Sequence, residues 1–113
     1  MFAMLMGLKS ISPQELHASL AKSALTVIDL NAYNSFMRAH VPGALNLMPE
    51  FEPQALPADK NVGLVFYCSN PMCLKAPRAA KRAGKLGYTD VRVMSAGIVG
   101  WTEAKLPVES TPG

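Results

Sequence analysis

The sequence predicts an α/β fold of three layers, in which a mostly parallel sheet of about five short strands has helices on both faces. Two observations support this prediction. Segments rich in β-branched and apolar residues alternate along the chain with segments of helical character, and this alternation is typical of parallel sheets. The two clearest strand segments, residues 25–30 and 62–67, are almost continuously apolar, which suits strands that are covered on both faces.

Length and composition favour one compact domain. The chain has 113 residues, of which 50% are hydrophobic and 17% are charged, and its net charge is +3. These fractions argue against a disordered chain, and a chain of this length buries roughly two-thirds of its unfolded surface on folding. Its two cysteines are too few for a disulfide scaffold. The longest apolar run is well short of a membrane span, so we expect no membrane association.

Turn and capping residues divide the chain into alternating elements. Ser12 and Glu15 can form a capping box around Pro13, which starts the first helix. The helix over 76–86 has Pro77 near its start, and Gly87 ends it. In chain order, the expected elements are a helix over 13–22, a strand over 25–30, a helix over 33–39, a strand over 44–47, one helical turn within 49–57, a strand over 62–67, a helix over 76–86, a strand over 91–94 and a helix over 98–104.

The two ends of the chain are expected to be tails. We assign residues 1–9 to an apolar N-terminal tail, residues 10–108 to the domain and residues 109–113 to a C-terminal tail. The apolar start has no preceding basic residue and no following cleavage site of small residues, so it makes a poor signal peptide. It is either a tail that packs on the domain or part of a longer chain. We expect a cytoplasmic location in the first case, and a periplasmic one if the N-terminus is truncated from a longer precursor.

Cys68 lies where chemistry is expected in such a sheet. In open α/β sheets ligands bind at the carboxyl ends of the strands, and Cys68 follows the strand over 62–67 directly. The loop after it leads into a helix N-terminus, where converging N–H groups form a cradle for anions. A free cysteine has a pKa of ~8.5, and helix N-termini or nearby cations lower it to roughly 3.5–7.5. Cys68 is therefore either an activated nucleophile or a buried, inert cysteine.

The helix after this loop carries positive charges and no acid. Lys75, Arg78, Arg82 and Lys85 recur at spacings of three and four, so they share one face, with Lys81 beside them. Lys75 and Arg78 lie at the N-terminal end, where the helix dipole disfavours cations by roughly 0.3–1 kcal/mol, so they are either anion-binding residues or part of a solvated face. For the other three cations we favour a solvated face. The helix over 75–86 is also a candidate surface for a protein partner, whereas one basic face does not indicate nucleic-acid binding.

Short motifs spread over residues 11–108 together resemble the rhodanese-like (sulfurtransferase) domain family in its single-domain form. Each motif alone is weak, but their order and spacing together are specific. The resemblance implies a rhodanese-like fold. The matching motifs are Asp29-Leu30-Asn31, Phe36, Ala39-His40-Val41-Pro42-Gly43-Ala44, Val65-Phe66-Tyr67-Cys68, Ala79-Ala80, Gly87-Tyr88, Gly97 and Gly100-Trp101.

The resemblance also implies an activity. A sulfurtransferase of this family takes sulfane sulfur from thiosulfate or another small persulfide donor, holds it as a persulfide on a cysteine, and passes it to a thiol or cyanide-type acceptor. Cys68 occupies the family's nucleophile position, and catalysis by an activated thiol would use amides of the active-site loop to stabilise the persulfide anion. The residues of that loop are Ser69, Asn70, Pro71, Met72, Cys73 and Leu74. No cofactor is expected.

Three departures from the family pattern bear on substrate recognition. Asn31 and Ser35 stand where the family often has an arginine and a glutamate, and Cys73 stands where an arginine commonly ends the loop. If the loop is instead about two residues longer, Lys75 falls near the arginine position, and the sequence leaves both registers open. In either register the chain lacks the fixed guanidinium that suits thiosulfate.

Cys73 suggests an alternative function. Its thiol can attack a persulfide or sulfenic acid on Cys68 and leave a disulfide, or it can pack under the helix start as a small hydrophobic residue. The alternative to the transferase is therefore a non-catalytic or redox-sensing module of the same fold that uses the Cys68/Cys73 pair. A phosphatase or arsenate reductase related to this fold would need an arginine six residues after Cys68, where Leu74 stands.

Other polar residues are given smaller roles. Asp29 ends a buried strand and is expected to accept backbone hydrogen bonds as a supporting residue behind the loop. His40 is expected to bond to backbone rather than to act as a general base, and His17 is expected at or near the surface. The two cysteines with His17 and His40 do not make the four-ligand pattern of zinc, so no metal ion is expected.

Overall fold

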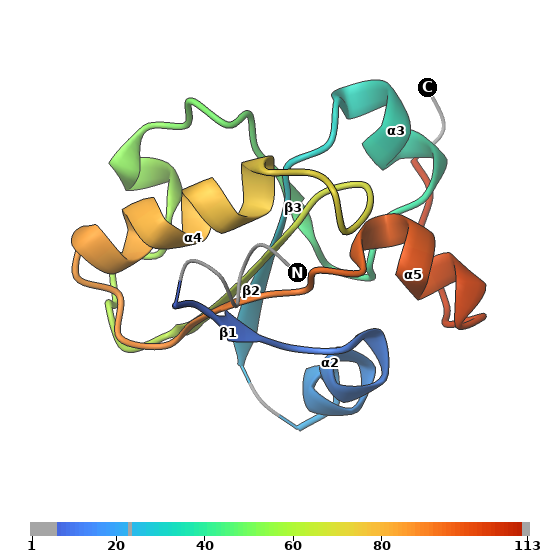
Figure 1. The fold of residues 1–113 in the computed structure, drawn as a ribbon, viewed down its shortest axis with the longest axis horizontal. Helices are drawn as coiled ribbons and strands as arrows, with labels where there is room; N and C mark the ends of the chain where they lie inside the picture. The colour runs from blue at the N-terminus through green and yellow to red at the C-terminus, as the bar shows by residue number, and fades with distance from the viewer. Residues whose placement is uncertain (1–6, 23, 112–113) are drawn as a thin grey trace.

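The computed structural model describes residues 7–22 and 24–111 and contains a parallel five-stranded sheet between helical layers (Figure 1). This arrangement confirms the expected fold class. The strand order is β1-β5-β4-β2-β3. The strands are β1 (Lys9–Ser10), β2 (Leu25–Asp29), β3 (Leu45–Asn46), β4 (Gly63–Tyr67) and β5 (Val91–Val93). The helices are α2 (Pro13–Leu20), α3 (Tyr33–Arg38), the 3-10 turn η1 (Pro53–Ala55), α4 (Lys75–Lys85) and α5 (Gly97–Glu103).

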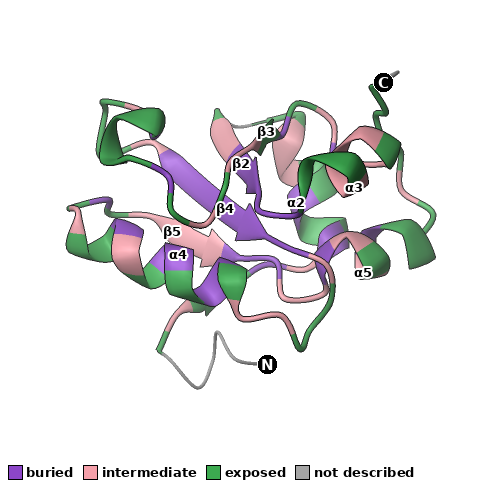
Figure 2. Cartoon of the chain, turned by 90° about the horizontal axis from the view of Figure 1, so that it is seen from above, coloured by how far each residue is buried: buried purple, intermediate pink, exposed green. Residues whose placement is uncertain are grey.

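Strand β4 is the centre of the molecule. It pairs along its whole length with β2, from Leu25 opposite Gly63 to Asp29 opposite Tyr67, and with β5 on its other side. All of its residues are buried, as Figure 2 shows. Because both of its edges and both of its faces are covered, β4 has a continuous apolar sequence rather than an alternating one.

Successive side chains of β4 point to opposite faces of the sheet and enter two separate cores. Leu64 and Phe66 pack on the face covered by α4, and Cys68 belongs to the same core. Val65 and Tyr67 pack on the other face, which α2 and α5 cover. The alanine-rich side of α4 is buried as expected, because small side chains let the helix approach the sheet closely.

The first helix begins as predicted and ends early. The N–H of Glu15 donates to Ser12 Oγ at 3.0 Å, and the N–H of Ser12 donates to Glu15 Oε1 at 2.9 Å, so the capping box is formed. The helix ends at Leu20 rather than at residue 22. Its end is a tight turn, in which the N–H of Lys22 donates to the carbonyl of Ser19. The other predicted elements are present, with ends that differ by a residue or two.

Strand β1 was not predicted from the sequence. Lys9 and Ser10 lie beside Arg92 and Val93 of β5, so Lys9 belongs to the sheet and not to a tail. Both residues of β1 are exposed and polar, so the sequence shows no apolar pattern there. The segment is a strand only because it pairs with β5. At the other end, Glu109 of the expected C-terminal tail forms an antiparallel bridge with His40.

The expected apolar tail lies mostly outside the described residues, since residues 1–6 are not described. Residue Leu8, which is described, packs against the core on the α4 face. Within the described ranges, no helix has the length and apolar character needed to cross a bilayer.

Candidate functional site

The loop over 68–74 lies at the carboxyl end of β4, between the N-terminal ends of α4 and α5 (Figure 1). Two amides of α5 hold its first residues. The N–H of Ile98 donates to the carbonyl of Cys68, and the N–H of Val99 donates to the carbonyl of Ser69, both at 3.0 Å. The backbone of Cys68 is therefore fixed by a segment about thirty residues further along the chain, as well as by β4 itself.

Gly97 makes this contact possible. It has a φ of +66°, a conformation that residues with a side chain rarely adopt. A Cβ atom at this position would lie 2.5 Å from the carbonyl carbon and oxygen of Ser69. From the sequence, α5 is expected to begin at residue 98. In the structure α5 begins at Gly97, and this glycine is the residue of the helix that packs against the loop.

Asn70 folds the loop back on itself. Its side-chain Oδ1 accepts a hydrogen bond from the N–H of Met72 at 2.9 Å, and its carbonyl accepts one from the N–H of Cys73 at 3.1 Å. These two bonds form a compact turn that returns the chain toward the end of β4. Asn70, Pro71 and Met72 at the tip of the loop are exposed. The sequence placed Asn70 in the loop but did not predict that it shapes the loop.

A disulfide bond joins Cys68 to Cys73. The Cα atoms are 6.5 Å apart, within the range that disulfides span. Cys68 is only 3% exposed, whereas Cys73 is partly exposed. In this form of the protein Cys68 is not an activated thiolate, because a sulfur in a disulfide carries no ionisable proton, and the structure matches the Cys68/Cys73 pair of the alternative function. Cys73 is not an isolated packing residue but the partner of Cys68.

The expected cradle of amides is also not assembled in this form. The N–H groups of Met72 and Cys73 are occupied by Asn70. The N–H groups of Ser69, Asn70 and Leu74 donate to no group in the described part of the chain. In that same part, no N–H donates to either sulfur. A neutral disulfide is a poor acceptor, so nothing draws these amides toward it.

A very small cavity adjoins the disulfide. Its volume is about 10 Å³, which is room for about one water molecule. Ser95 lines the cavity, and its Oγ is buried with no hydrogen-bond partner among residues 7–22 and 24–111. No sequence pattern pointed to Ser95, because only the fold brings the end of β5 beside the loop. The remaining lining residues are Cys68, Asn70, Pro71, Cys73, Ala76, Pro77, Val93 and Met94.

Helix α4 begins beside the loop without a side-chain cap, with Leu74 at the capping position. Lys75 and Arg78 are exposed at this end, as expected, and form no ion pair with any residue that the structure describes. Arg82 differs from the expected solvated residue. Its Nη1 donates to the carbonyl of Phe51 at 2.7 Å, and its guanidinium lies 4.6 Å from the centre of the Phe51 ring. Arg82 therefore ties the loop around Phe51 to α4.

Asp29 lies on the opposite side of the sheet from the disulfide. Its carboxylate accepts hydrogen bonds from Tyr67 Oη at 2.5 Å and from the N–H of Asn31 at 2.7 Å. The Tyr67 oxygen in turn accepts the N–H of Val41 at 3.0 Å. Burial raises the pKa of Asp29, and these hydrogen bonds partly offset that effect. Asp29 accepts a backbone hydrogen bond and has a supporting role, as expected, but the group that it supports is Tyr67, the neighbour of Cys68, and not an amide of the loop.

His40 has the expected structural role. Its Nδ1 lies 2.7 Å from the carbonyl of Phe36, its ring stacks on the Phe36 ring, and its Nε2 lies 3.7 Å from Glu109. His17 is exposed near Trp101. The described residues contain no group of three or more His, Cys, Asp or Glu side chains placed to hold a metal ion.

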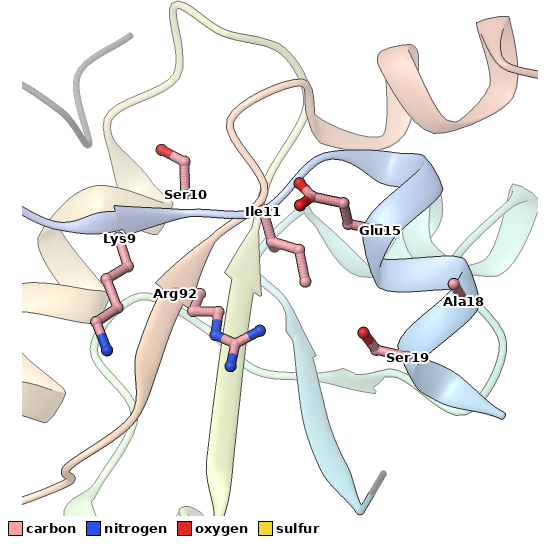
Figure 3. Close-up of a pocket in the computed structure, with 7 residues that line it drawn as sticks. All are labelled: Lys9, Ser10, Ile11, Glu15, Ala18, Ser19 and Arg92. Atoms are coloured by element: carbon pink, nitrogen blue, oxygen red, sulfur yellow. The ribbon is translucent and has the colours of Figure 1, made fainter. Parts of the chain in front are cut away.

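A wider groove of about 570 Å³ lies between β1, α2 and β5 (Figure 3). None of the loop residues lines it. Three charged residues line it: Glu15 belongs to the capping box, Arg92 pairs with Asp90 at 3.1 Å, and Lys9 lies on the exposed strand β1. The lining of the groove includes no cysteine and no histidine, whereas the loop over 68–74 holds both cysteines of the sequence and is the candidate active site.

Comparison with known proteins relates the chain to one domain family. The sequence profile of the rhodanese-like domain family matches residues 12–104. The uncharacterized protein YibN of Escherichia coli K12 is 28% identical over 105 residues, which are 88% of this chain and 71% of YibN.

Solved structures have the same fold. A thiosulfate sulfurtransferase from Pseudomonas aeruginosa superimposes with a TM-score of 0.81 and 26% identity over 91% of this chain, which spans only 19% of that protein. The BH2092 protein of Bacillus halodurans has a TM-score of 0.81 and 21% identity over 91% of this chain and 77% of its own.

Proposed function

Because this chain belongs to the rhodanese-like domain family, we propose that it is a sulfurtransferase in which Cys68 carries sulfane sulfur as a persulfide. The observation that carries this proposal is the place of Cys68. It directly follows the central strand β4, its carbonyl is held by α5, and the loop after it leads into the N-terminus of α4. Ligands of open α/β sheets bind at this position.

The proposed reaction has two half-reactions. The Cys68 thiolate attacks the outer sulfur of thiosulfate, the sulfur–sulfur bond of the donor breaks, and sulfite leaves with the bonding electrons. The outer sulfur of the resulting persulfide is then taken by a thiolate or by cyanide, which restores the Cys68 thiolate. A low pKa of the Cys68 thiol would favour both half-reactions, since the thiolate is first the nucleophile and then the leaving group.

Several polar groups near Cys68 support the proposal, because they have no partner among the described residues of the disulfide form and can bond to a persulfide anion. The N–H groups of Ser69, Asn70 and Leu74 have no acceptor in the described part of the chain, and Ser95 Oγ lies unpartnered in the cavity beside Cys68. Hydrogen-bond donors directed at an anion that forms during a reaction stabilise it. These donors would turn to the sulfur once the disulfide is reduced.

Lys75 and Arg78 are proposed to attract the anionic donor. Both side chains are exposed at the N-terminal end of α4, on the side where the loop enters the helix. Neither is a fixed guanidinium held against the site, so we expect attraction of several small anions rather than strict selection of thiosulfate. A protein partner at the basic face of α4 stays a prediction. Arg82 is not part of that face, because it donates to the Phe51 carbonyl. The cations that remain are Lys75, Arg78, Lys81 and Lys85.

Intact mass spectrometry tests the transfer. Cys73→Ser protein is reduced, freed of reductant and incubated with thiosulfate, and we expect it to gain the mass of one sulfur atom. The matched control, Cys68→Ser combined with Cys73→Ser, should gain none. Addition of cyanide should then remove the extra sulfur and produce thiocyanate. If Cys73→Ser gains no sulfur from thiosulfate or from a low-molecular-weight persulfide, the transferase proposal is wrong.

The disulfide favours a second candidate, a redox-sensing module that transfers no sulfur. In that case oxidation and reduction of Cys68 and Cys73 would alter the loop that lies between α4 and α5. The same experiment separates the two candidates. A sensor would form and release the disulfide reversibly, whereas its Cys73→Ser variant would gain no sulfur from any sulfane donor.

A further inference from the structure

We infer that Cys73 attacks the Cys68 persulfide and releases its outer sulfur as sulfide, so that the chain reduces sulfane sulfur as well as transferring it. This inference rests on the transferase function proposed above. It assigns to Cys73 a chemical role in the reaction, and it makes the Cys68–Cys73 disulfide the product of that step. The natural reductant for the product is a dithiol.

The fold brings the two cysteines together without disturbing the sheet. Asn70 holds the turn through the N–H groups of Met72 and Cys73, and this turn returns Cys73 to the end of β4. The Cα atoms of the two cysteines are 6.5 Å apart, while the backbone of Cys68 keeps its hydrogen bond to Ile98. A thiol at position 73 is therefore within reach of the inner sulfur of a persulfide on Cys68.

The step balances in atoms and electrons. The Cys73 thiolate attacks Sγ of the protonated Cys68 persulfide, the bond from Sγ to the outer sulfur breaks, and hydrosulfide leaves with the bonding electrons. Two thiol sulfurs are oxidised to one disulfide, and one sulfane sulfur is reduced by two electrons to sulfide. The proton of the persulfide departs on the hydrosulfide, so the step needs no further acid or oxidant.

The burial of the two sulfurs indicates how the disulfide is opened again. While the disulfide is closed, Cys68 is 3% exposed and the cavity beside it holds about 10 Å³, so its sulfur is the less accessible of the two to an external thiol. Cys73 is partly exposed next to the exposed loop tip. One thiolate of the dithiol therefore attacks Cys73, and Cys68 leaves as the thiolate. The second thiol of the reductant then displaces Cys73, and both cysteines are reduced for the next cycle.

A single-turnover measurement tests the release of sulfide. Wild-type protein is fully reduced, freed of reductant without oxygen, and mixed with one equivalent of thiosulfate in the absence of cyanide. We expect about one sulfide per chain, and a protein two hydrogen atoms lighter than its reduced form, because the disulfide has formed. Cys73→Ser and Cys73→Ala should keep the added sulfur and release at least about tenfold less sulfide.

The two proposals fail in different ways. Sulfur uptake by Cys73→Ser, with an equally persistent persulfide in the wild type, would overturn the role of Cys73 and leave the transferase standing. Absence of uptake in Cys73→Ser, whose loop still folds by circular dichroism, would overturn both.

A separate measurement shows which cysteine of the disulfide an external thiol attacks first. Oxidised wild type is treated with a small monothiol, quenched with an alkylating agent and digested. We expect the mixed disulfide on Cys73 and the alkyl group on Cys68, and the opposite pattern would contradict the direction of attack.

Discussion

Tyr67 and Cys68 are neighbours in the sequence, yet they lie on opposite faces of the sheet and are held in different ways. Tyr67 Oη donates to Asp29 at 2.5 Å and accepts the N–H of Val41 at 3.0 Å. The side chain of Cys68 is bonded to Cys73. Hydrogen bonds within a buried network persist as long as the fold does, whereas a disulfide can be exchanged by any thiol that reaches it.

This difference shows how one strand end can combine rigid support with a reactive group. The backbone around Tyr67 and Cys68 is fixed from three sides, since their carbonyls accept the N–H groups of Leu30 and Ile98, and the carbonyl of Phe66 accepts that of Met94. Opening the disulfide therefore leaves the position of Cys68 unchanged and frees only the loop that follows. Four substitutions test how the surroundings of Cys68 and of Tyr67 are held, beginning with the largest expected effect.

Gly97→Ala should have the largest effect, because it disturbs the loop that follows Cys68. The new Cβ would lie 2.5 Å from the Ser69 carbonyl at a φ of +66°, so the loop or α5 must move, and we expect a loss of about 3 kcal/mol in the free energy of unfolding. Sulfur uptake by Cys68 should fall as well. Urea unfolding measures the loss. Gly84→Ala is the matched control, because Gly84 lies in α4 with open space around it, and it should stabilise by roughly 0.5–1 kcal/mol. Equal effects of the two substitutions would contradict the close contact.

Tyr67→Phe should weaken the buried hydrogen-bond network of Tyr67. It leaves the buried N–H of Val41 without an acceptor and removes a donor from Asp29, for a loss of about 2 kcal/mol in the free energy of unfolding. Tyr33→Phe, at an exposed tyrosine, is the control and should change stability by less than about 0.5 kcal/mol. If the two variants unfold at the same urea concentration, the network is not a support.

Asp29→Asn should change how stability depends on pH. Burial raises the pKa of Asp29 in the folded protein, so the folded state holds this proton more tightly than the unfolded chain. The stability that Asp29 contributes is therefore complete below its ordinary pKa and is lost as pH rises through the raised pKa. The free energy of unfolding of the wild type, relative to Asp29→Asn, should fall with rising pH in that window by at most about 1.4 kcal/mol per unit. A difference that is independent of pH between mild acid and neutrality would refute this.

Arg82→Met should have the smallest effect. It removes the hydrogen bond to the Phe51 carbonyl and the contact with the Phe51 ring, and we expect a loss of about 1 kcal/mol. Lys81→Met on the same helix is the control, since Lys81 is exposed, and it should be close to neutral. Thermal unfolding of both variants distinguishes an engaged arginine from a solvated one.

Local patterns predicted much of the fold and part of the site. The apolar run of β4, the capping box at Ser12 and the alanine face of α4 each depend on neighbouring residues, so the sequence alone is sufficient to recognise them. Cys68 at the end of β4 follows from the same reasoning, because the end of a strand and the start of the next helix can be read locally. Strand β1 could not be predicted in this way, since Lys9 and Ser10 become a strand only by pairing with β5.

The sequence by itself therefore determined the order of the elements, the two-sided burial of the central strand and the position of Cys68 at its carboxyl end. The tertiary structure decided the rest: that Gly97 and Ile98 hold the loop, that Arg82 bonds to Phe51, and that Asp29 supports Tyr67 from the opposite face. The physical reason is distance along the chain. Contacts between neighbours follow from local propensity, whereas contacts between distant segments exist only after the sheet and its helices have packed.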